Sequence, residues 1–220
     1  MLRRLFAEGA RKLARALRLQ RTGGLLDSPP IISLRRALAT PVSAGDVAGI
    51  IDRLAAGGVG CWLAGGWGVD ALAGRQTRRH VDVDVMVDDS DGGGARARTI
   101  LAGLGFEPVE DGAPGLAPWM PVRIKLRDGR GRTVELLPVP VRRPGEALAP
   151  LDPSVDQSFV YSPEHFTSGE VGSRVVPCLS AEIQLRTHAG YPLRPWDRRD
   201  VETVLRRLGK RPGETGRAEP

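Results

Sequence analysis

The sequence is poor in cysteine, in aromatic residues and in long apolar runs. Its two cysteines, Cys61 and Cys178, are too few for a disulfide framework and lack the spacing of zinc ligands. We therefore expect reduced, core-facing thiols in a cytoplasmic protein. Aromatic residues make up 5% of the chain, which argues against a base-stacking RNA surface. No stretch reaches the roughly 18 apolar residues of a transmembrane segment.

Lysine is scarce as well, with only Lys12, Lys125 and Lys210, so the net charge of +6 comes mainly from arginine. This excess suits an anionic partner such as a nucleotide, although an arginine-rich composition equally reflects a coding bias. The 220 residues, with 41% hydrophobic and 26% charged content, are ordinary for one substantial globular domain with or without a small appendage.

Composition divides the chain into four segments. Residues 1–30 form a basic amphipathic N-terminal segment and a linker that ends in GGLLDSPP. This segment fits three interpretations: a membrane-surface helix, an arm that binds nucleic acid or a partner, or a helix docked on the body. Residues 41–141 form a compact core, residues 142–209 an irregular Pro-containing insertion with a helical C-terminal region, and residues 210–220 a disordered tail.

From residue 41 onward, the sequence predicts a series of helices and strands. A helix begins at Ser43, with Asp46 in the capping-box position, and ends at Gly57-Gly58. Two further helices are expected to begin at Ser180 and Asp197. The other expected elements are a strand over 59–64, a helix over 67–73, the strand HVDVDVMVDD (80–89), a helix over about 92–104, and strands over 122–128 and 133–139.

The strand at 80–89 alternates valine with aspartate. The valines at 81, 83, 85 and 87 are expected to face a core, which leaves Asp82 and Asp84 on the opposite face, about 6–7 Å apart. Such a pair is unfavourable as bare charges, yet it suits Mg²⁺, which takes one or two carboxylates together with substrate phosphates. The pattern therefore predicts a magnesium site.

Two flanking features complete the predicted site. Gly65 and Gly66 end a strand and begin a helix, where backbone amides approach a phosphate closely. Glu135 lies in TVELLPV, and it becomes a third acid if that strand pairs beside the aspartate strand. The strand at 122–128 places Lys125 in phase with Arg123 and Arg127, facing either a cleft or solvent.

The stretch GGWGVDALAGRQTRRHVDVDVMV, from Gly65 to Val87, resembles the signature of lincosamide and aminoglycoside nucleotidyltransferases in the polymerase-β-like superfamily. A second block, RVVPCLSAEIQLRTHAGY (174–191), resembles the family's C-terminal segment. The resemblance covers approximately residues 41–208 and marks 41–141 as a nucleotidyltransferase core. It implies an α+β fold, in which a mixed sheet carries the acids, helices flank the sheet, and a helical C-terminal part closes a cleft.

The resemblance also implies the chemistry, which is transfer of a nucleoside monophosphate from an NTP, expected to be ATP, to a hydroxyl of a small molecule such as an aminoglycoside or lincosamide antibiotic. By position, Asp82, Asp84 and Glu135 would be the catalytic, Mg²⁺-binding acids, with the third as base. Many relatives carry aspartate where this chain has Glu135, so its carboxylate moves by about one C–C bond.

Four residues between Gly66 and Asp82 are assigned roles as well. Arg75 and Arg78 are expected to bind the triphosphate, since guanidinium matches phosphate oxygens in bidentate fashion. His80 joins this nucleotide-binding set, either orienting a carboxylate or packed as a neutral core histidine. Asp70 is expected to be structural, holding Arg75 or Arg78.

Two other functions remain open from the residues alone. The basic N-terminal segment favours the same chemistry on an RNA or protein acceptor, as in nucleotidyltransferase toxins. The change to Glu135 leaves room for a non-catalytic nucleotide-binding protein on this fold.

Overall fold

The computed structural model describes residues 39–109, 123–141, 161–188 and 193–209. The predicted N-terminal segment and linker, the predicted tail and most of the predicted insertion lie outside these residues. In the described part, no helix is long and apolar enough to cross a membrane.

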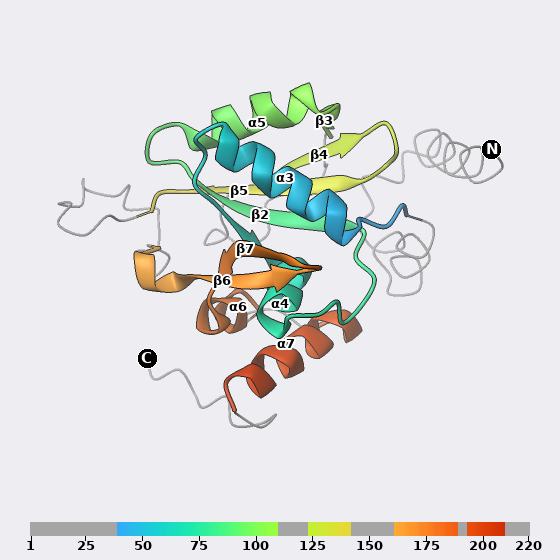
Figure 1. Cartoon of the computed structure of the whole chain (residues 1–220), viewed down its shortest axis with the longest axis vertical. Coiled ribbons are helices and arrows are strands. Elements are labelled where there is room, and N and C mark those ends of the chain that lie inside the picture. The colour runs from blue at the N-terminus through green and yellow to red at the C-terminus, as the bar shows by residue number, and fades with distance from the viewer. Residues whose placement is uncertain (1–38, 110–122, 142–160, 189–192, 210–220) are drawn as a thin grey trace, which may run out of the picture.

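A seven-stranded mixed sheet forms the centre of the protein (Figure 1). Its spatial order is β3-β4-β5-β2-β1-β7-β6, so β2, the aspartate strand, is the middle strand. β2 runs antiparallel to β1 on one side and parallel to β5 on the other. The strands are β1 (Cys61–Ala64), β2 (Asp82–Asp88), β3 (Phe106–Pro108), β4 (Ile124–Asp128), β5 (Thr133–Val139), β6 (Phe166–Val171) and β7 (Arg174–Leu179).

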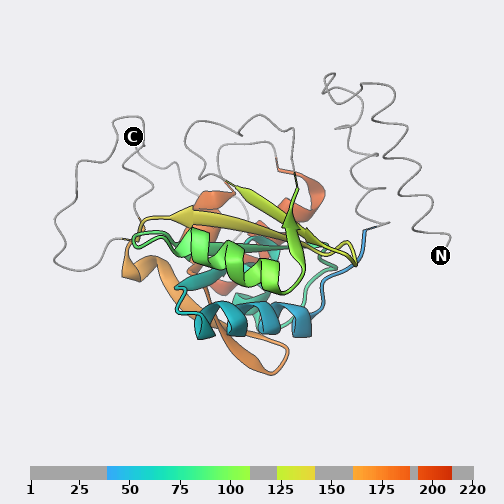
Figure 2. The ribbon, with the colours of Figure 1, turned by 90° about the horizontal axis from the view of Figure 1, so that it is seen from above.

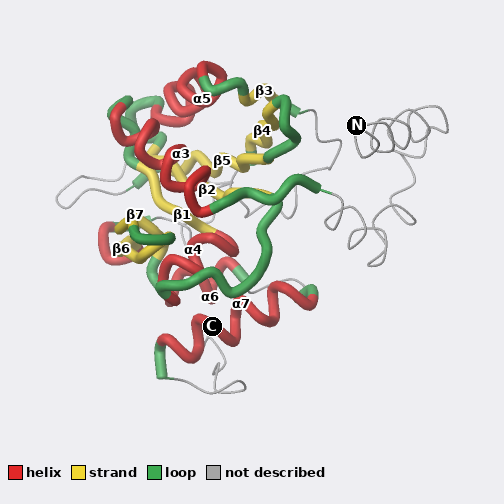
Figure 3. Tube along the Cα trace, turned by 45° about the vertical axis from the view of Figure 1, so that its right-hand side comes forward, coloured by secondary structure: helices red, strands yellow, loops and turns green. Residues whose placement is uncertain are grey.

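Five helices accompany the sheet in the described residues. The helices α3 and α5 lie together on one side of it (Figure 2), whereas α4, α6 and α7 pack against one another in a separate group (Figure 3). These helices are α3 (Ala44–Ala56), α4 (Gly65–Ala73), α5 (Gly93–Gly103), α6 (Ala181–Thr187) and α7 (Pro195–Arg207).

The first described helix, α3, confirms its predicted capping box. The Ser43 hydroxyl accepts a hydrogen bond from the Asp46 amide at 3.1 Å, and the Asp46 carboxylate accepts one from the Ser43 amide at 2.9 Å. Gly57 forms the C-terminal cap, as predicted. Because these two bonds satisfy otherwise unpaired donors of the first turn, the helix begins at a defined residue.

The alternation in β2 separates two hydrophobic clusters. Val83, Val85 and Val87 are fully buried in the larger cluster, which also takes side chains from α3 and α5. Met86 faces the other side and packs with Leu137 and with Ile183 of α6. Both cysteines are buried, as predicted, and burial raises the pKa of each thiol to about 12.

The region after residue 141 differs from its prediction. The segment up to residue 170 was expected to be irregular, whereas β6 begins at Phe166 and forms a hairpin with β7. β7 also runs parallel to β1, so the sheet continues into the C-terminal region. The β6 sequence FTSGEV lacks an apolar alternation, and most of its residues are exposed or half-buried. α4 packs closely on it at Gly169, where a Cβ would come within 2.4 Å of the Ala71 backbone.

The two C-terminal helices follow the prediction with one correction. Ser180 is the N-cap of α6 and His188 is its C-cap, as expected. The last helix begins two residues before Asp197, because Pro195 occupies the first helical position, where its missing N–H costs nothing. Asp197 is instead the third helical residue, and its carboxylate accepts a hydrogen bond from the Arg194 amide at 3.0 Å.

Candidate active site

Three acidic side chains share one face of the sheet at its centre. In the parallel pairing of β2 with β5, Asp84 lies directly opposite Glu135, and Asp82 lies opposite Thr133. Paired residues on neighbouring strands point to the same face, about 5 Å apart. The prediction that TVELLPV pairs beside the aspartate strand is therefore confirmed, and so is the placement of Glu135 on the same side as both aspartates.

On its other side, Glu135 contacts two cations, Lys125 of β4 and Arg123 just before that strand. Lys125 is its antiparallel partner, and the Lys125 Nζ lies 3.2 Å from Glu135 Oε1. Arg123 donates a hydrogen bond to Glu135 Oε2 at 3.1 Å. The Glu135 side chain is 12% exposed, so its negative charge is largely shielded from water and is compensated by these two groups. Lys125 and Arg123 thus face the site.

The charge of Asp84 is strongly disfavoured. Burial, followed by the negative charges of Glu135 and Asp82, raises the pKa of Asp84 to about 7, although Arg123 and Arg78 act in the opposite direction. An aspartate normally titrates near 4. This face of the sheet therefore carries an excess of negative charge that favours a bound proton or cation.

The turn between β1 and α4 lies directly against Asp84. Gly65 has a φ of +54°, in the left-handed region, and a Cβ there would come within 2.0 Å of Asp84 Oδ2. A Cβ at Gly66 would come within 2.2 Å of the Arg78 guanidinium and 2.6 Å of the His80 ring. Only glycine fits at both positions, so the start of α4 is held close to a carboxylate and to a cation.

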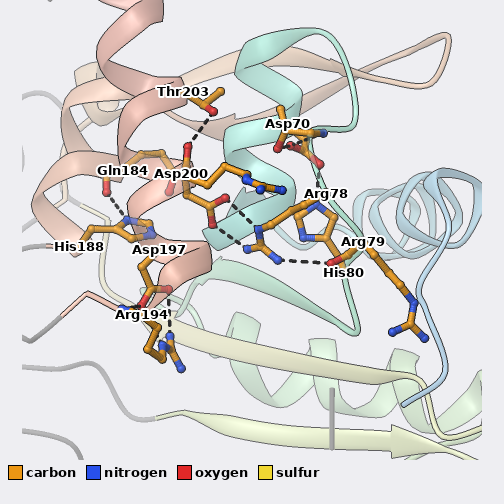
Figure 4. Close-up of polar contacts among 12 residues, drawn as sticks. Asp70, Arg78, Arg79, His80, Gln184, His188, Arg194, Asp197, Asp200 and Thr203 are labelled. Atoms are coloured by element: carbon orange, nitrogen blue, oxygen red, sulfur yellow. Dashed lines mark hydrogen bonds and ion pairs between the residues drawn. The ribbon is translucent and has the colours of Figure 1, made fainter. Parts of the chain in front are cut away.

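Arg78 makes a bidentate ion pair with Asp200 of α7 (Figure 4). Arg78 Nε lies 2.9 Å from one carboxylate oxygen of Asp200, and an Arg78 terminal nitrogen lies 2.6 Å from the other. The two side chains are 10% and 1% exposed. Asp200 was missed in the sequence, although an acid one helical turn before the buried Val204 was a usable signal.

Asp70 and His80 form a second buried contact within the motif. His80 Nε2 contacts one oxygen of Asp70, and the Thr77 amide donates to the other oxygen at 3.0 Å. Both side chains are 1% exposed, and the His80 ring packs on Trp67. Asp70 is structural as predicted, but it holds Thr77 and His80 rather than Arg75 or Arg78; Arg75 is exposed.

The carboxylate oxygens of the three acids are suitable ligands for a magnesium ion, but their side chains are not arranged as a complete metal site. In the described residues, no three His, Cys, Asp or Glu side chains are arranged to hold a metal. The third predicted ligand, Glu135, is turned toward its two cations. The donors themselves are all carboxylate oxygens, which Mg²⁺ prefers, and the raised pKa of Asp84 marks a position where a divalent cation would offset excess negative charge.

Comparison with known proteins identifies the family to which the chain is similar. Residues 46–204 match the model of the aminoglycoside-2''-adenylyltransferase family. A lincosamide resistance protein of Staphylococcus haemolyticus is 29% identical over 143 residues, which cover 65% of this chain and 82% of that protein.

Two solved structures are similar in fold. The lincosamide antibiotic adenylyltransferase LnuA, with lincomycin bound, is 26% identical with a TM-score of 0.57, covering 75% of this chain and 98% of LnuA. ANT(2'')-Ia in complex with adenylyl-2''-tobramycin is 18% identical with a TM-score of 0.55, covering 76% of this chain and 89% of that one. The chain belongs to the aminoglycoside-2''-adenylyltransferase family and is an enzyme of the nucleotidyltransferase type.

Proposed function

We propose that this enzyme transfers AMP from ATP to a hydroxyl group of a small antibiotic in a Mg²⁺-dependent reaction. The observation that carries the proposal is the strand register that sets Glu135 opposite Asp84, on the face that also holds Asp82. The relatives described above are a lincosamide adenylyltransferase and an enzyme in complex with adenylyl-2''-tobramycin, which supports an antibiotic as acceptor.

The triphosphate would bind at the start of α4. The first amides of a helix have no partner within the helix and favour anions, and Gly65 and Gly66 bring them close to Asp84. Arg78, held over Gly66 by Asp200, would neutralise phosphate charge, and the exposed Arg75 would approach from solvent. His80 is too buried to reach a nucleotide directly, so its part would be to position Gly66 and Arg78 from behind.

Asp82 and Asp84 would hold the magnesium ion, and Glu135 would join them only by leaving its contacts with Lys125 and Arg123. When bound, the ion supplies charge neutralisation at the phosphates and aligns them for in-line displacement. This chain's own contribution is to fix the two carboxylates on a rigid central strand, beside the turn that receives the phosphates.

Glu135 would act as the general base. It accepts the proton of the acceptor hydroxyl as that oxygen bonds to the α-phosphorus, while the bond from the α-phosphorus to the bridging oxygen breaks and pyrophosphate leaves. The contacts of Lys125 and Arg123 with Glu135 keep its carboxylate at a defined position. The same contacts accommodate the longer side chain that replaces the aspartate expected in many relatives.

The direct test incubates the purified protein with ATP and Mg²⁺ together with lincosamides and aminoglycosides. We expect an antibiotic whose mass increases by one AMP and an equal amount of pyrophosphate, both absent for Asp84→Asn. The proposal is wrong if no acceptor in the panel gains AMP, and ATP binding without turnover would identify the protein as a nucleotide-binding scaffold instead.

A further inference from the structure

The order of strands separates the two substrates of the proposed reaction. The phosphate-binding turn follows β1, on one side of β2, whereas Glu135 lies on β5, on the other side. In-line displacement requires the attacking oxygen and the leaving pyrophosphate to lie on opposite sides of the phosphorus. With pyrophosphate at Gly65 and Gly66, the acceptor hydroxyl must enter over β5 and β4.

The described residues on this acceptor side are rich in positive charge. Lys125 and Arg127 of β4 lie on the face of Glu135, while Ile124, Leu126 and Asp128 point to the other face. Arg123, just before β4, reaches the same face through its contact with Glu135. Two acids accompany these three cations on β3 and β5. Glu107 is the register partner of Arg127, and Glu135 already contacts Lys125 and Arg123.

We propose that Arg123 and Lys125 make this enzyme select acceptors of low positive charge and reject polycationic ones. The inference rests on the proposed nucleotidyl transfer and chooses among its substrates: a hydroxylated acceptor with at most one basic amine fits, whereas a polyamine such as an aminoglycoside meets like charge beside the base. Like charges at about 4 Å repel strongly at the edge of a protein, where the effective dielectric is lower than in water.

Tobramycin, a polyamine, is the binding probe. Titration calorimetry measures the tobramycin affinity of wild type and of Arg123→Glu/Lys125→Glu, with Mg²⁺ and a non-hydrolysable ATP analogue present. The matched control is Arg53→Glu/Arg98→Glu, which changes net charge equally at exposed positions of α3 and α5 on the opposite face. Thermal unfolding confirms that each variant folds. We expect tobramycin to bind the Arg123/Lys125 variant at least about tenfold more tightly than wild type, and the control to behave like wild type.

A second readout compares transfer to tobramycin with transfer to lincomycin, which has a single basic amine. Because the ratio of kcat/KM for the two acceptors cancels any general loss of catalysis, it isolates selectivity. We expect wild type to favour lincomycin at least about tenfold and the Arg123/Lys125 variant to narrow that ratio.

Three results would overturn the inference. The first is equal tobramycin affinity in wild type and in the Arg123/Lys125 variant. The second is a gain in tobramycin affinity in the control variant as large as that in the Arg123/Lys125 variant. The third is wild-type transfer to tobramycin with the same kcat/KM as transfer to lincomycin. Absence of transfer to every acceptor would instead contradict the proposed function, and the binding comparison would still decide the role of Arg123 and Lys125.

Discussion

Glu135 lies between two opposite electrostatic environments. On β2, Asp84 is its register partner and repels it, whereas Lys125 of β4 and Arg123, which precedes β4, attract it. A carboxylate in this position has a fixed location, which a general base requires. The same arrangement leaves Asp84 with the largest unfavourable charge in the site, so function and stability are opposed at one residue.

Replacing Glu135 with Gln keeps the shape of the side chain and removes its ability to accept a proton. We expect kcat to fall about 10²- to 10⁴-fold. The affinity for ATP should change little, because the proposed phosphate site lies on the other side of β2. Steady-state kinetics and nucleotide titration measure the two quantities. A kcat within tenfold of wild type would show that Glu135 is not the base.

Replacing Asp84 with Asn should inactivate the enzyme and stabilise the metal-free protein. Folding raises the pKa of Asp84 from about 4 to about 7. Between these two pH values the folded state binds more protons than the unfolded state. The free energy of unfolding therefore falls as pH rises from about 4 to about 7, and it stays low above pH 7. In EDTA, urea unfolding should show a gain on the order of 2 kcal/mol at pH 8, and a smaller gain at pH 5.

The control for this prediction is Asp91→Asn, which removes an exposed carboxylate that pairs with Arg96. Exposed ion pairs contribute about 0–1 kcal/mol, so this variant should unfold like wild type at both pH values. A loss of stability in Asp84→Asn at pH 8 would mean that the charge of Asp84 is compensated in the metal-free protein.

At the scale of elements, Arg78 couples the nucleotide side of the site to α7. The connection between α4 and β2 carries Arg78, and α7 supplies Asp200 more than a hundred residues later in the chain. Arg78 also lies against Gly66, at the start of α4. The last helix therefore holds in place the arginine that we propose binds the phosphates.

Removing one member of this buried pair should be costly. We expect Asp200→Asn to lower the free energy of unfolding by about 3–5 kcal/mol, because Arg78 then remains buried without its counter-ion. The double variant Arg78→Met/Asp200→Leu should recover much of that stability and still bind ATP weakly. Urea unfolding and nucleotide titration separate these effects, and an Asp200→Asn protein as stable as wild type would contradict this role.

At the scale of the whole molecule, nucleotide binding should stabilise the fold only when magnesium is present. The acids come from β2 and β5, the proposed phosphate turn from β1 and α4, and the acid that holds Arg78 from α7. A bound nucleotide would therefore connect the central strands of the sheet with α4 and, through Arg78, with α7. At about 100 times its Kd, a ligand adds about 2.7 kcal/mol. Thermal unfolding should therefore show a higher Tm with ATP and Mg²⁺, and EDTA or Asp82→Asn/Asp84→Asn should abolish the increase.

Local patterns in the sequence predicted most of the elements that build the site. The β5 strand has its predicted bounds, and the alternation of valine and aspartate in β2 correctly separated the core face from the acidic face. The capping pair Ser43 and Asp46 correctly located the start of α3, because a helix start depends on residues only a few positions apart.

Features that depend on contacts between distant segments were missed. β6 has little apolar alternation, and nothing local in FTSGEV indicates that α4 packs on its Gly169. The pairing of Arg78 with Asp200 joins two arginine-rich, acid-containing stretches with many equivalent partners. The contacts of Lys125 and Arg123 with Glu135 could be predicted only with the sheet register in hand. From the sequence alone, these side chains could face either a cleft or solvent.

The most direct test of a single catalytic centre on β2 and β5 is a crystal structure with Mn²⁺ and a non-hydrolysable ATP analogue. We predict an anomalous peak in contact with the carboxylates of both Asp82 and Asp84, with the triphosphate lying on Gly65 and Gly66. A nucleotide bound elsewhere, or no peak at these carboxylates in saturating Mn²⁺, would contradict the account.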